Sequence, residues 1–104
     1  KFEDIPTDVK EWNKINESSI KIYPNPVQKG ENIFFKLFLD KNTNVQIEII
    51  DCFGRRIGNI FETYLETREN TLQYNFENNQ ISGVYWIKIT INDKQIVKPI
   101  IIMN

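Results

Sequence analysis

The 104-residue chain contains no histidine and a single cysteine, Cys52. Without histidine, the chain lacks the commonest general base and the commonest metal ligand, and catalytic Ser–His and Cys–His pairs are excluded. One cysteine cannot form an internal disulfide, so we expect Cys52 to be a small apolar filler near a turn. The four glycines form no phosphate-binding loop. These absences remove several common classes of active site.

Neither sign of charge predominates, and no long hydrophobic run is present. The chain has 13 lysine and arginine residues against 14 aspartate and glutamate residues, a formal net charge of −1. This balance argues against nucleic acid and anionic membrane surfaces as partners, since both require clustered basic residues. No apolar run approaches the roughly 20 residues that span a bilayer, so we expect no direct membrane span. The first residues do not resemble a signal peptide, which predicts that such an address lies elsewhere in a longer precursor.

Carboxylates and amides are present, but their spacing does not define a site. Three acidic residues fall in polar loop sequence, where a solvated surface is the expected role: Glu62, Glu66 and Glu69. Asp40, Asn42 and Asn44 alternate as the first ligands of a calcium loop do, yet no glycine follows and no glutamate closes the loop. We therefore predict no catalytic residues, no metal ligands and no cofactor, and hence a protein that is not an enzyme.

Residues 1–18 differ in character from the rest of the chain. Four apolar residues of this segment have helical spacing: Ile5, Val9, Trp12 and Ile15. A helix here is too short to be stable without a docking surface. We therefore predict a linker with at most one short helix over residues 1–18 and a single domain over residues 19–104. The boundary is expected in a polar run, Asn16, Glu17, Ser18 and Ser19.

From Ile20 onward, apolar residues alternate with polar ones or form short runs, and turn residues separate the segments. Seven such segments are expected to be strands: residues 20–23, 33–39, 45–50, 56–64, 72–76, 85–91 and 95–103. Short strands separated by turns every 8 to about 12 residues are typical of sandwiches. We therefore predict an all-β, immunoglobulin-like β-sandwich of about seven antiparallel strands without a disulfide. Residues 33–39 are apolar on both faces except for Lys36, which predicts a strand covered on both sides, or at least the most buried one.

Prolines and one glycine are expected to shape the ends and edges of the sheets. Pro24 and Pro26 flank Asn25, and this arrangement predicts a stiff, extended approach to the domain that a helix or a central strand cannot contain. Pro99 cannot donate to a strand ladder, so we expect the last segment to lie at an edge or to contain a bulge. Gly54 permits a positive φ, as expected in a hairpin turn or bulge.

The aromatic residues leave several classes of function open. Tyr85 shares the face of the neighbouring isoleucines and is expected in the core, whereas Trp86 is expected to point outward. An outward tryptophan is typical of an interface, and Trp86 with Tyr64 are candidates for a sugar-stacking platform. The residues alone therefore leave three classes: a recognition or sorting module, a carbohydrate-binding module, and an adhesive structural domain.

Four motifs follow one another along the chain: residues 22–27 with Gly30, residues 45–55, residues 81–89 and residues 98–104. In this order, over about residues 20–104, they resemble the C-terminal sorting domain of proteins exported by the type IX secretion system of Bacteroidetes. The resemblance places the sorting-motif residues at Tyr23, Pro24, Asn25, Pro26, Gly54, Gly83, Tyr85, Lys98, Ile100, Ile101 and Ile102.

The resemblance implies a secretion signal that is itself folded. It implies that the domain directs an N-terminal cargo domain through the outer-membrane type IX translocon, and that a sortase then removes it. The cut is expected within about residues 14–20, with Asn16, Glu17, Ser18 and Ser19 as the candidates. The protein is expected in the periplasm during transit, and then at the outer membrane, at the cell surface or in the medium. The alternative is a carbohydrate-binding or adhesive immunoglobulin-like accessory module.

The last segment also offers a physical mechanism of recognition. An apolar terminal strand with an edge proline is suited to add to the sheet of a partner or of another copy, so the same edge allows a homodimer. The elements that face the translocon are expected in residues 98–104 and around Gly83 and Tyr85. Deleting residues 98–104 is expected to trap cargo in the periplasm while the sandwich still forms.

Overall fold

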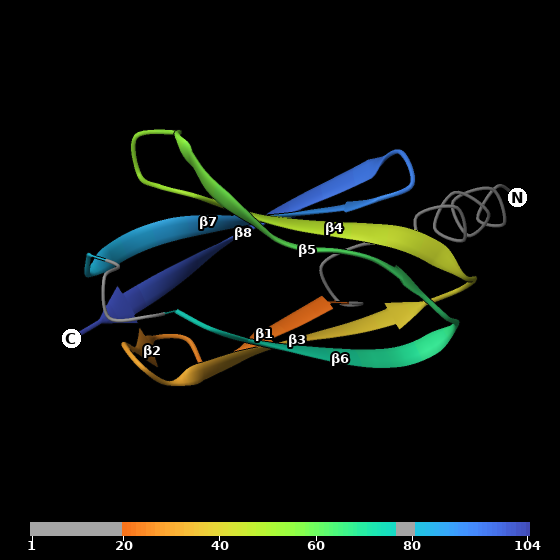
Figure 1. Ribbon diagram of the computed structural model, residues 1–104, viewed down its shortest axis with the longest axis horizontal. Coiled ribbons are helices and arrows are strands. Elements are labelled where there is room, and N and C mark those ends of the chain that lie inside the picture. The colour runs from red at the N-terminus through yellow and green to blue at the C-terminus, as the bar shows by residue number, and fades with distance from the viewer. Residues whose placement is uncertain (1–19, 77–80) are drawn as a thin grey trace, which may run out of the picture.

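Eight strands make up the part of the chain that the computed structural model describes, residues 20–76 and 81–104 (Figure 1). They are β1 (Ile20–Tyr23), β2 (Val27–Gln28), β3 (Asn32–Leu39), β4 (Thr43–Ile50), β5 (Arg56–Leu65), β6 (Arg68–Asn75), β7 (Gly83–Ile91) and β8 (Lys94–Met103). The predicted linker with its short helix, and the candidate cleavage residues 16–19, lie outside the described residues.

The strands form two sheets that pack face to face, as the two layers of Figure 1 show. One sheet has the order β1-β3-β6 and the other the order β2-β8-β7-β4-β5. Every pairing is antiparallel except that of β2 with β8, which is parallel. This architecture confirms the predicted all-β, immunoglobulin-like sandwich without a disulfide. The described residues contain eight strands rather than about seven, because β2 is too short to produce a periodic pattern.

The proline segment connects the two sheets. β1 ends at Tyr23 in the three-stranded sheet, three bent residues follow, and β2 begins at Val27 in the five-stranded sheet. The peptide bonds before Pro24 and Pro26 are both cis. Because residues 24–26 bend and carry the chain from one sheet to the other, the prediction of an extended approach is wrong for them. β1 itself is an edge strand of four residues, as a strand that ends at a proline allows.

The core lies between the sheets and takes every second residue of β3, β4, β7 and the end of β8, while β5 and β6 contribute partly buried residues. The four longest buried series are Ile33, Phe35, Leu37 and Leu39 on β3, Val45, Ile47 and Ile49 on β4, Tyr85, Ile87, Ile89 and Ile91 on β7, and Ile100 and Ile102 on β8. This alternation follows from the pleat, which turns successive side chains to opposite faces. It confirms that Tyr85 points inward and that Trp86, 39% exposed, points outward.

Only one face of β3 is covered, so the prediction of a strand covered on both sides is wrong. Phe35 is fully buried, whereas Phe38 on the outer face is 57% exposed. The ring of Phe34, also outward, stacks on Tyr23 of the neighbouring strand with 5.4 Å between centroids. Cross-strand aromatic pairing explains apolar residues on this face without a covering layer. β3 does carry four core residues, consistent with its expected place among the most buried strands.

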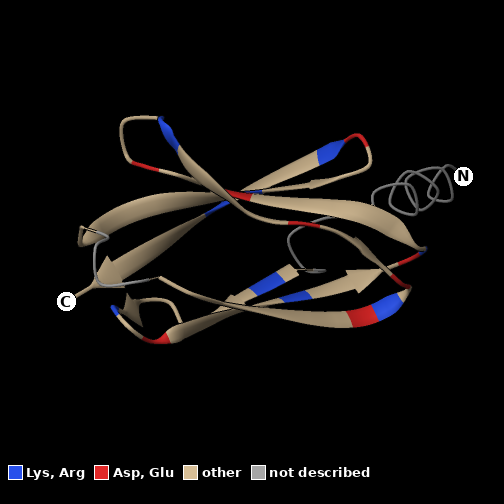
Figure 2. Cartoon of the chain, in the orientation of Figure 1, with Lys and Arg blue, Asp and Glu red and all other residues tan. Residues whose placement is uncertain are grey.

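Charges of both signs are interspersed over both layers (Figure 2). The described ion pairs bridge neighbouring strands or one turn, such as Lys36 with Glu69 (3.0 Å) and Arg56 with Glu48 (3.0 Å). The hydrogen bond and the charge of Glu69 raise the pKa of Lys36. This distribution fits the nearly neutral sequence and shows no field of one sign over the described residues.

Candidate functional site

The second motif ends in a tight turn that Asp51 organises. Asp51 is 6% exposed, and its Oδ1 accepts hydrogen bonds from the backbone N–H groups of Phe53 (2.9 Å) and Arg55 (2.8 Å). Its Oδ2 accepts a hydrogen bond from Nε of Arg55 (2.8 Å). Gly54 donates its N–H to the Asp51 carbonyl (3.0 Å) at φ +84°, a conformation that glycine adopts without strain. The prediction of a glycine turn is confirmed, but the sequence analysis missed the role of Asp51.

The same turn exposes an aromatic and a cation. Phe53 is 79% exposed, and the guanidinium carbon of Arg55 lies 5.4 Å from the centroid of its ring. Cys52 is exposed as well, so the prediction that it fills apolar space is wrong. Backbone hydrogen bonds and the Asp51 carboxylate hold this turn, and they leave the Cys52 side chain at the surface rather than in the core. This turn therefore presents its side chains to solvent on a rigid base.

The Asp51 carboxylate is held in its ionised form. Burial by itself raises the pKa of Asp51. The opposite effect is larger: Arg55 donates hydrogen bonds from its backbone and side chain, Phe53 donates one from its backbone, and Arg55 is positively charged. Together they lower the pKa of Asp51 below its ordinary value of 3.8. A lowered pKa in the folded state means that ionised Asp51 stabilises the fold. That stabilisation is complete above the ordinary pKa and is lost as the pH falls through the lowered one.

Replacing Asp51 by asparagine is therefore expected to lower the midpoint of thermal unfolding at about pH 7, and less so near pH 2. The reason is that the parent loses its carboxylate charge on acidification, whereas the Asp51→Asn variant has no charge to lose. Circular dichroism at a series of pH values measures both midpoints. Asp93→Asn, which removes one negative charge from an exposed turn, is the control. A difference between parent and Asp51→Asn that is constant down to about pH 2 would contradict this account.

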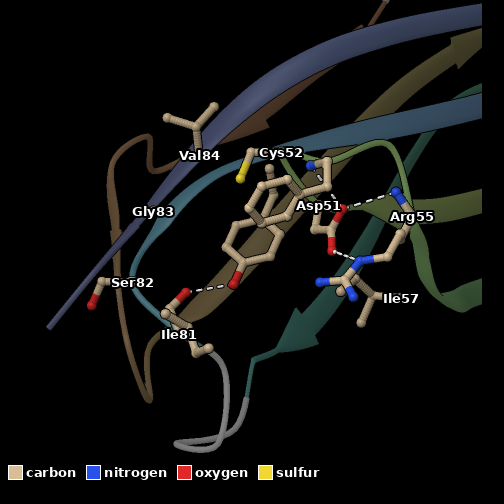
Figure 3. A pocket seen from close by; sticks show the side chains of 10 residues that line it. Asp51, Cys52, Arg55, Ile57, Ile81, Ser82, Gly83 and Val84 are labelled. Carbon is tan, nitrogen blue, oxygen red and sulfur yellow. Dashed lines mark hydrogen bonds and ion pairs between the residues drawn. The ribbon is translucent and has the colours of Figure 1, made fainter.

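The third motif contains a tyrosine corner. The hydroxyl of Tyr85, near the start of β7, donates to the carbonyl oxygen of Ile81 four residues upstream (Figure 3). A tyrosine that bonds back to the chain in this way is a hallmark of immunoglobulin-like sandwiches. Burial, with the nearby Asp51 charge, raises the pKa of Tyr85, so the phenol stays protonated and able to donate. Gly83 lies between the two at φ +150°, which side chains rarely allow. Tyr85 and Gly83 thus shape the corner.

The second and third motifs meet at a small pocket (Figure 3). Its volume is about 250 Å³; residues 51–57 line one side and residues 81–85 the other. Ile81 is 76% exposed at its rim, and Ile57 and Val84 are partly exposed. Two motifs that are separated by about 30 residues in sequence therefore form one surface.

The first and fourth motifs are joined by the side chain of Asn25. Its Nδ2 donates to the carbonyl of Pro99 (3.1 Å), and its Oδ1 accepts from the backbone N–H of Ile101 (3.0 Å). The amide thus takes the place of a neighbouring strand along this part of β8. β2 continues the same line by pairing Val27 with Ile102. Sequence analysis marked Asn25 as a motif residue but did not find this role, since the only local signal is an amide between two prolines.

Within the fourth motif, side chains alternate between core and surface. Ile100 and Ile102 are fully buried, whereas Ile101 is 42% exposed on the outer face. Lys98 is half-buried at the edge of the sandwich and lines a depression beside β1. The predicted motif residues of β8 therefore do not form one surface, and Ile101 is the isoleucine that a partner can contact.

Exposed apolar side chains of β7 and β8 gather on the outer face of the five-stranded sheet. The register places Val84 opposite Ile101 and Trp86 opposite Pro99. We call this surface the outer apolar patch and define it as Val84, Trp86, Val97, Pro99, Ile101 and Met103, all of which are exposed. Exposed apolar groups on neighbouring strands are typical of surfaces that bind a partner.

The structure does not assemble the sugar-stacking platform. Trp86 pairs with Ile50 of β4, whereas Tyr64 pairs with Asn44 at the other end of the same strand. Six residues of extended strand separate these positions, which corresponds to about 20 Å. Two rings so far apart do not stack on one sugar.

The described residues form neither a cluster of metal ligands nor a membrane-spanning helix. No group of three or more histidine, cysteine, aspartate or glutamate side chains among them is placed to hold a metal ion. In the loop first considered for calcium, the Asn42 side chain accepts a hydrogen bond from the backbone N–H of Thr67 (2.8 Å) instead. None of the described segments is a helix of the length and apolarity needed to cross a membrane.

The fold and the site together define a small immunoglobulin-like recognition domain whose four motifs are joined in pairs. The chain belongs to the secretion system C-terminal sorting domain family, whose model matches residues 21–103. It is therefore a sorting domain of type IX secretion, and the family marks proteins that are exported to the cell surface or secreted. Domains of this family interact with the type IX machinery and are attached to a cargo.

Comparison with solved structures supports the fold alone. The chain is similar to part of the Pseudomonas fluorescens alkylpurine DNA glycosylase AlkC bound to DNA containing an abasic site analog, with a TM-score of 0.53 and 10% sequence identity. The match covers 82% of this chain and 29% of the glycosylase, so the chain spans less than a third of that protein's length. Comparison with curated proteins gives no match.

Proposed function

We propose that this chain acts, without catalysis, as a folded signal that the outer-membrane type IX translocon recognises in order to export an N-terminal cargo. The observation that carries the proposal is the outer apolar patch, in which the third and fourth motifs of the sequence lie side by side on β7 and β8. A signal read in this way exists only in the folded domain, because residues from two strands form it.

The outer apolar patch has the properties of a docking surface. Trp86 lies within it, and tryptophan is enriched at the centres of interfaces. The register places Val84 and Pro99 next to Trp86 on the same face, and the buried isoleucines of β7 lie on the opposite face of the sheet. The partner that fits is an apolar surface of a translocon component, which would cover these side chains when the domain docks.

We also propose that a sortase removes the domain by cutting within residues 14–20, at the candidates Asn16, Glu17, Ser18 and Ser19. In support, Ile20 is 2% exposed and begins β1, paired with Leu37. A cut before Ile20 leaves every described strand intact. The same observation supports a division into a linker over residues 1–18 and a sorting domain over residues 19–104.

Replacing Ile101 by aspartate is expected to reduce export roughly tenfold, because docking would then bury an unpaired carboxylate. Residues 1–104 are fused behind a signal peptide and a fluorescent reporter in a bacterium with a working type IX system. Reporter in the medium or at the surface is compared with reporter in the periplasm. Mass spectrometry of the exported reporter locates the cut.

Phe38→Asp is the matched control, since it places the same charge at an exposed apolar position on the other sheet. Its export is expected to equal that of the parent, and both purified variants are expected to unfold cooperatively. Equal export of the Ile101→Asp variant and the parent would refute the outer apolar patch as the docking surface. Retention of the unmodified fusion in the periplasm would refute sorting by this domain altogether.

A further inference from the structure

The first half of β8 is an open sheet edge. On the side away from β7, the carbonyls of Pro99 and Met103 and the N–H of Ile101 are bonded to Asn25 and Lys29. β8 pairs with β7 without a register shift, so Gln95 and Val97 direct their N–H and C=O groups to this same side. β2 reaches only the end of β8, and no other described strand adjoins it there.

The open edge has a defined length. Beyond Val97, Pro99 has no N–H to donate, and its carbonyl already accepts the Asn25 amide. Before Gln95, the chain turns at the tip of the β7–β8 hairpin, where Asn92 has φ +55°. An added strand therefore has four backbone groups to bond, two each from Gln95 and Val97. It would continue the line that β2 and Asn25 occupy.

A lysine stands at each end of this window. Lys94 and Lys98 are opposite Ile91 and Ile87 of β7, so both side chains emerge on the face toward the other sheet. Neither forms an ion pair with another described residue. Lys98 and Lys21 of β1 also line a depression of about 540 Å³ between the two sheet edges, and none of the described residues that line it is acidic. The edge therefore offers positive charge on one face.

These lysines disfavour a second copy as the occupant. Two β8 edges that pair antiparallel around Ile96 would join Gln95 of one to Val97 of the other, with four hydrogen bonds. The same register sets Lys94 directly opposite Lys98 at both ends, and like charges opposite each other destabilise a pair. If one edge shifts along the other to the next hydrogen-bonding register, Pro99 enters the pairing. Hydrogen bonds are then lost, because Pro99 has no N–H and its carbonyl is already bonded to Asn25.

We propose that residues 94–98 are a docking site for an extended segment of a partner protein, added antiparallel, with acidic residues four positions apart opposite Lys94 and Lys98. Backbone hydrogen bonds supply the attachment, and the two charge pairs select the partner and its register. Lysines on an edge strand keep copies of the domain apart, and here the same residues favour an acidic strand. The site uses the backbone edge of β8, whereas the outer apolar patch uses outward side chains; Val97 belongs to both, through its backbone here and its side chain there. The proposal does not depend on the sorting function.

The double variant Lys94→Glu/Lys98→Glu provides the acidic strand for a test. Sedimentation equilibrium of the full chain is expected to show parent and double variant each monomeric, and their equimolar mixture associating about tenfold more tightly than either alone. Lys94→Glu alone is self-complementary, and it is expected to dimerise by itself. Adding Val97→Pro is expected to abolish both associations, because it removes an N–H at the centre of the window.

Lys41→Glu, which makes the same change of charge in an exposed turn away from the edge, is the control and is expected to stay monomeric. The unfolding midpoint of each variant shows that it remains folded. A mixture no more associated than its components, or a Lys94→Glu variant that behaves like Lys41→Glu, would overturn the proposal. So would a complex that survives Val97→Pro, since charge alone would then hold it. Secretion is not measured, so a failure here is distinct from a failure of the sorting function.

Discussion

Replacing Phe35 by alanine is expected to lower the free energy of unfolding by about 3–5 kcal/mol. Phe35 is fully buried at the centre of β3, and its ring meets that of Phe61 edge-on with 6.1 Å between centroids. The substitution removes the contacts of the ring and leaves a cavity between the two sheets. Because small domains are stable by only about 5–15 kcal/mol, this loss is a large fraction of the total. Chemical denaturation followed by fluorescence or circular dichroism measures it.

Phe38→Ala is the matched control on the same strand. Phe38 is 57% exposed on the outer face, so its replacement is expected to change stability by about 0.5 kcal/mol or less. If the signal is folded, Phe35→Ala also reduces export of a fused reporter, while Phe38→Ala does not. Equal destabilisation by the two variants would contradict the assignment of the buried face of β3.

The faces of the long strands could be predicted because each strand buries one side only. In β7, the isoleucines at 87, 89 and 91 follow Tyr85 at a period of two, and the structure buries all four. A shift by one residue would expose all of them, so the pattern specifies the faces strongly. For β3 the same reasoning failed on its outer face, because Phe34 and Phe38 are apolar without being covered.

The features that the sequence did not reveal depend on contacts between distant segments. The Asn25 side chain forms hydrogen bonds with the backbone of Pro99 and Ile101, which lie 74 and 76 positions further along the chain. β2 is a strand only because β8 lies beside it. Short segments of this kind have no periodicity of their own, so tertiary contacts alone determine their structure. The crossover at residues 24–26 belongs to the same class.

For the candidate site, the motifs were found from the sequence, but the roles of single residues were not. Gly83 and Tyr85 were expected to face the translocon, and the structure places both at the tyrosine corner. Ile100 and Ile102 belong to the core, whereas Ile101 and Trp86 are exposed. A motif therefore combines residues needed for folding with residues open to a partner, and only burial separates the two groups.

Deleting residues 98–104 is expected to unfold the domain, although the sequence suggested that the sandwich would survive. The deletion removes Ile100 and Ile102, whose exposed fractions are 0% and 1%. Truncating one buried isoleucine costs about 2–5 kcal/mol, so losing both approaches the stability of the whole domain. β2 would also lose its partner strand, and β7 would lose its pairing from Gly83 to Ile87. Thermal unfolding of residues 1–97, compared with residues 1–104, measures the effect.

Loss of export after this deletion would therefore not show that the translocon contacts the tail, because the outer apolar patch disappears together with the fold. The Ile101→Asp variant separates the two causes, since it alters an exposed side chain and keeps β8 paired. If residues 1–97 unfold cooperatively at the same midpoint as the parent, the core described for β8 is wrong. If they are unfolded while the Ile101→Asp variant is folded but retained in the periplasm, the tail acts both as a core strand and as part of the recognition surface.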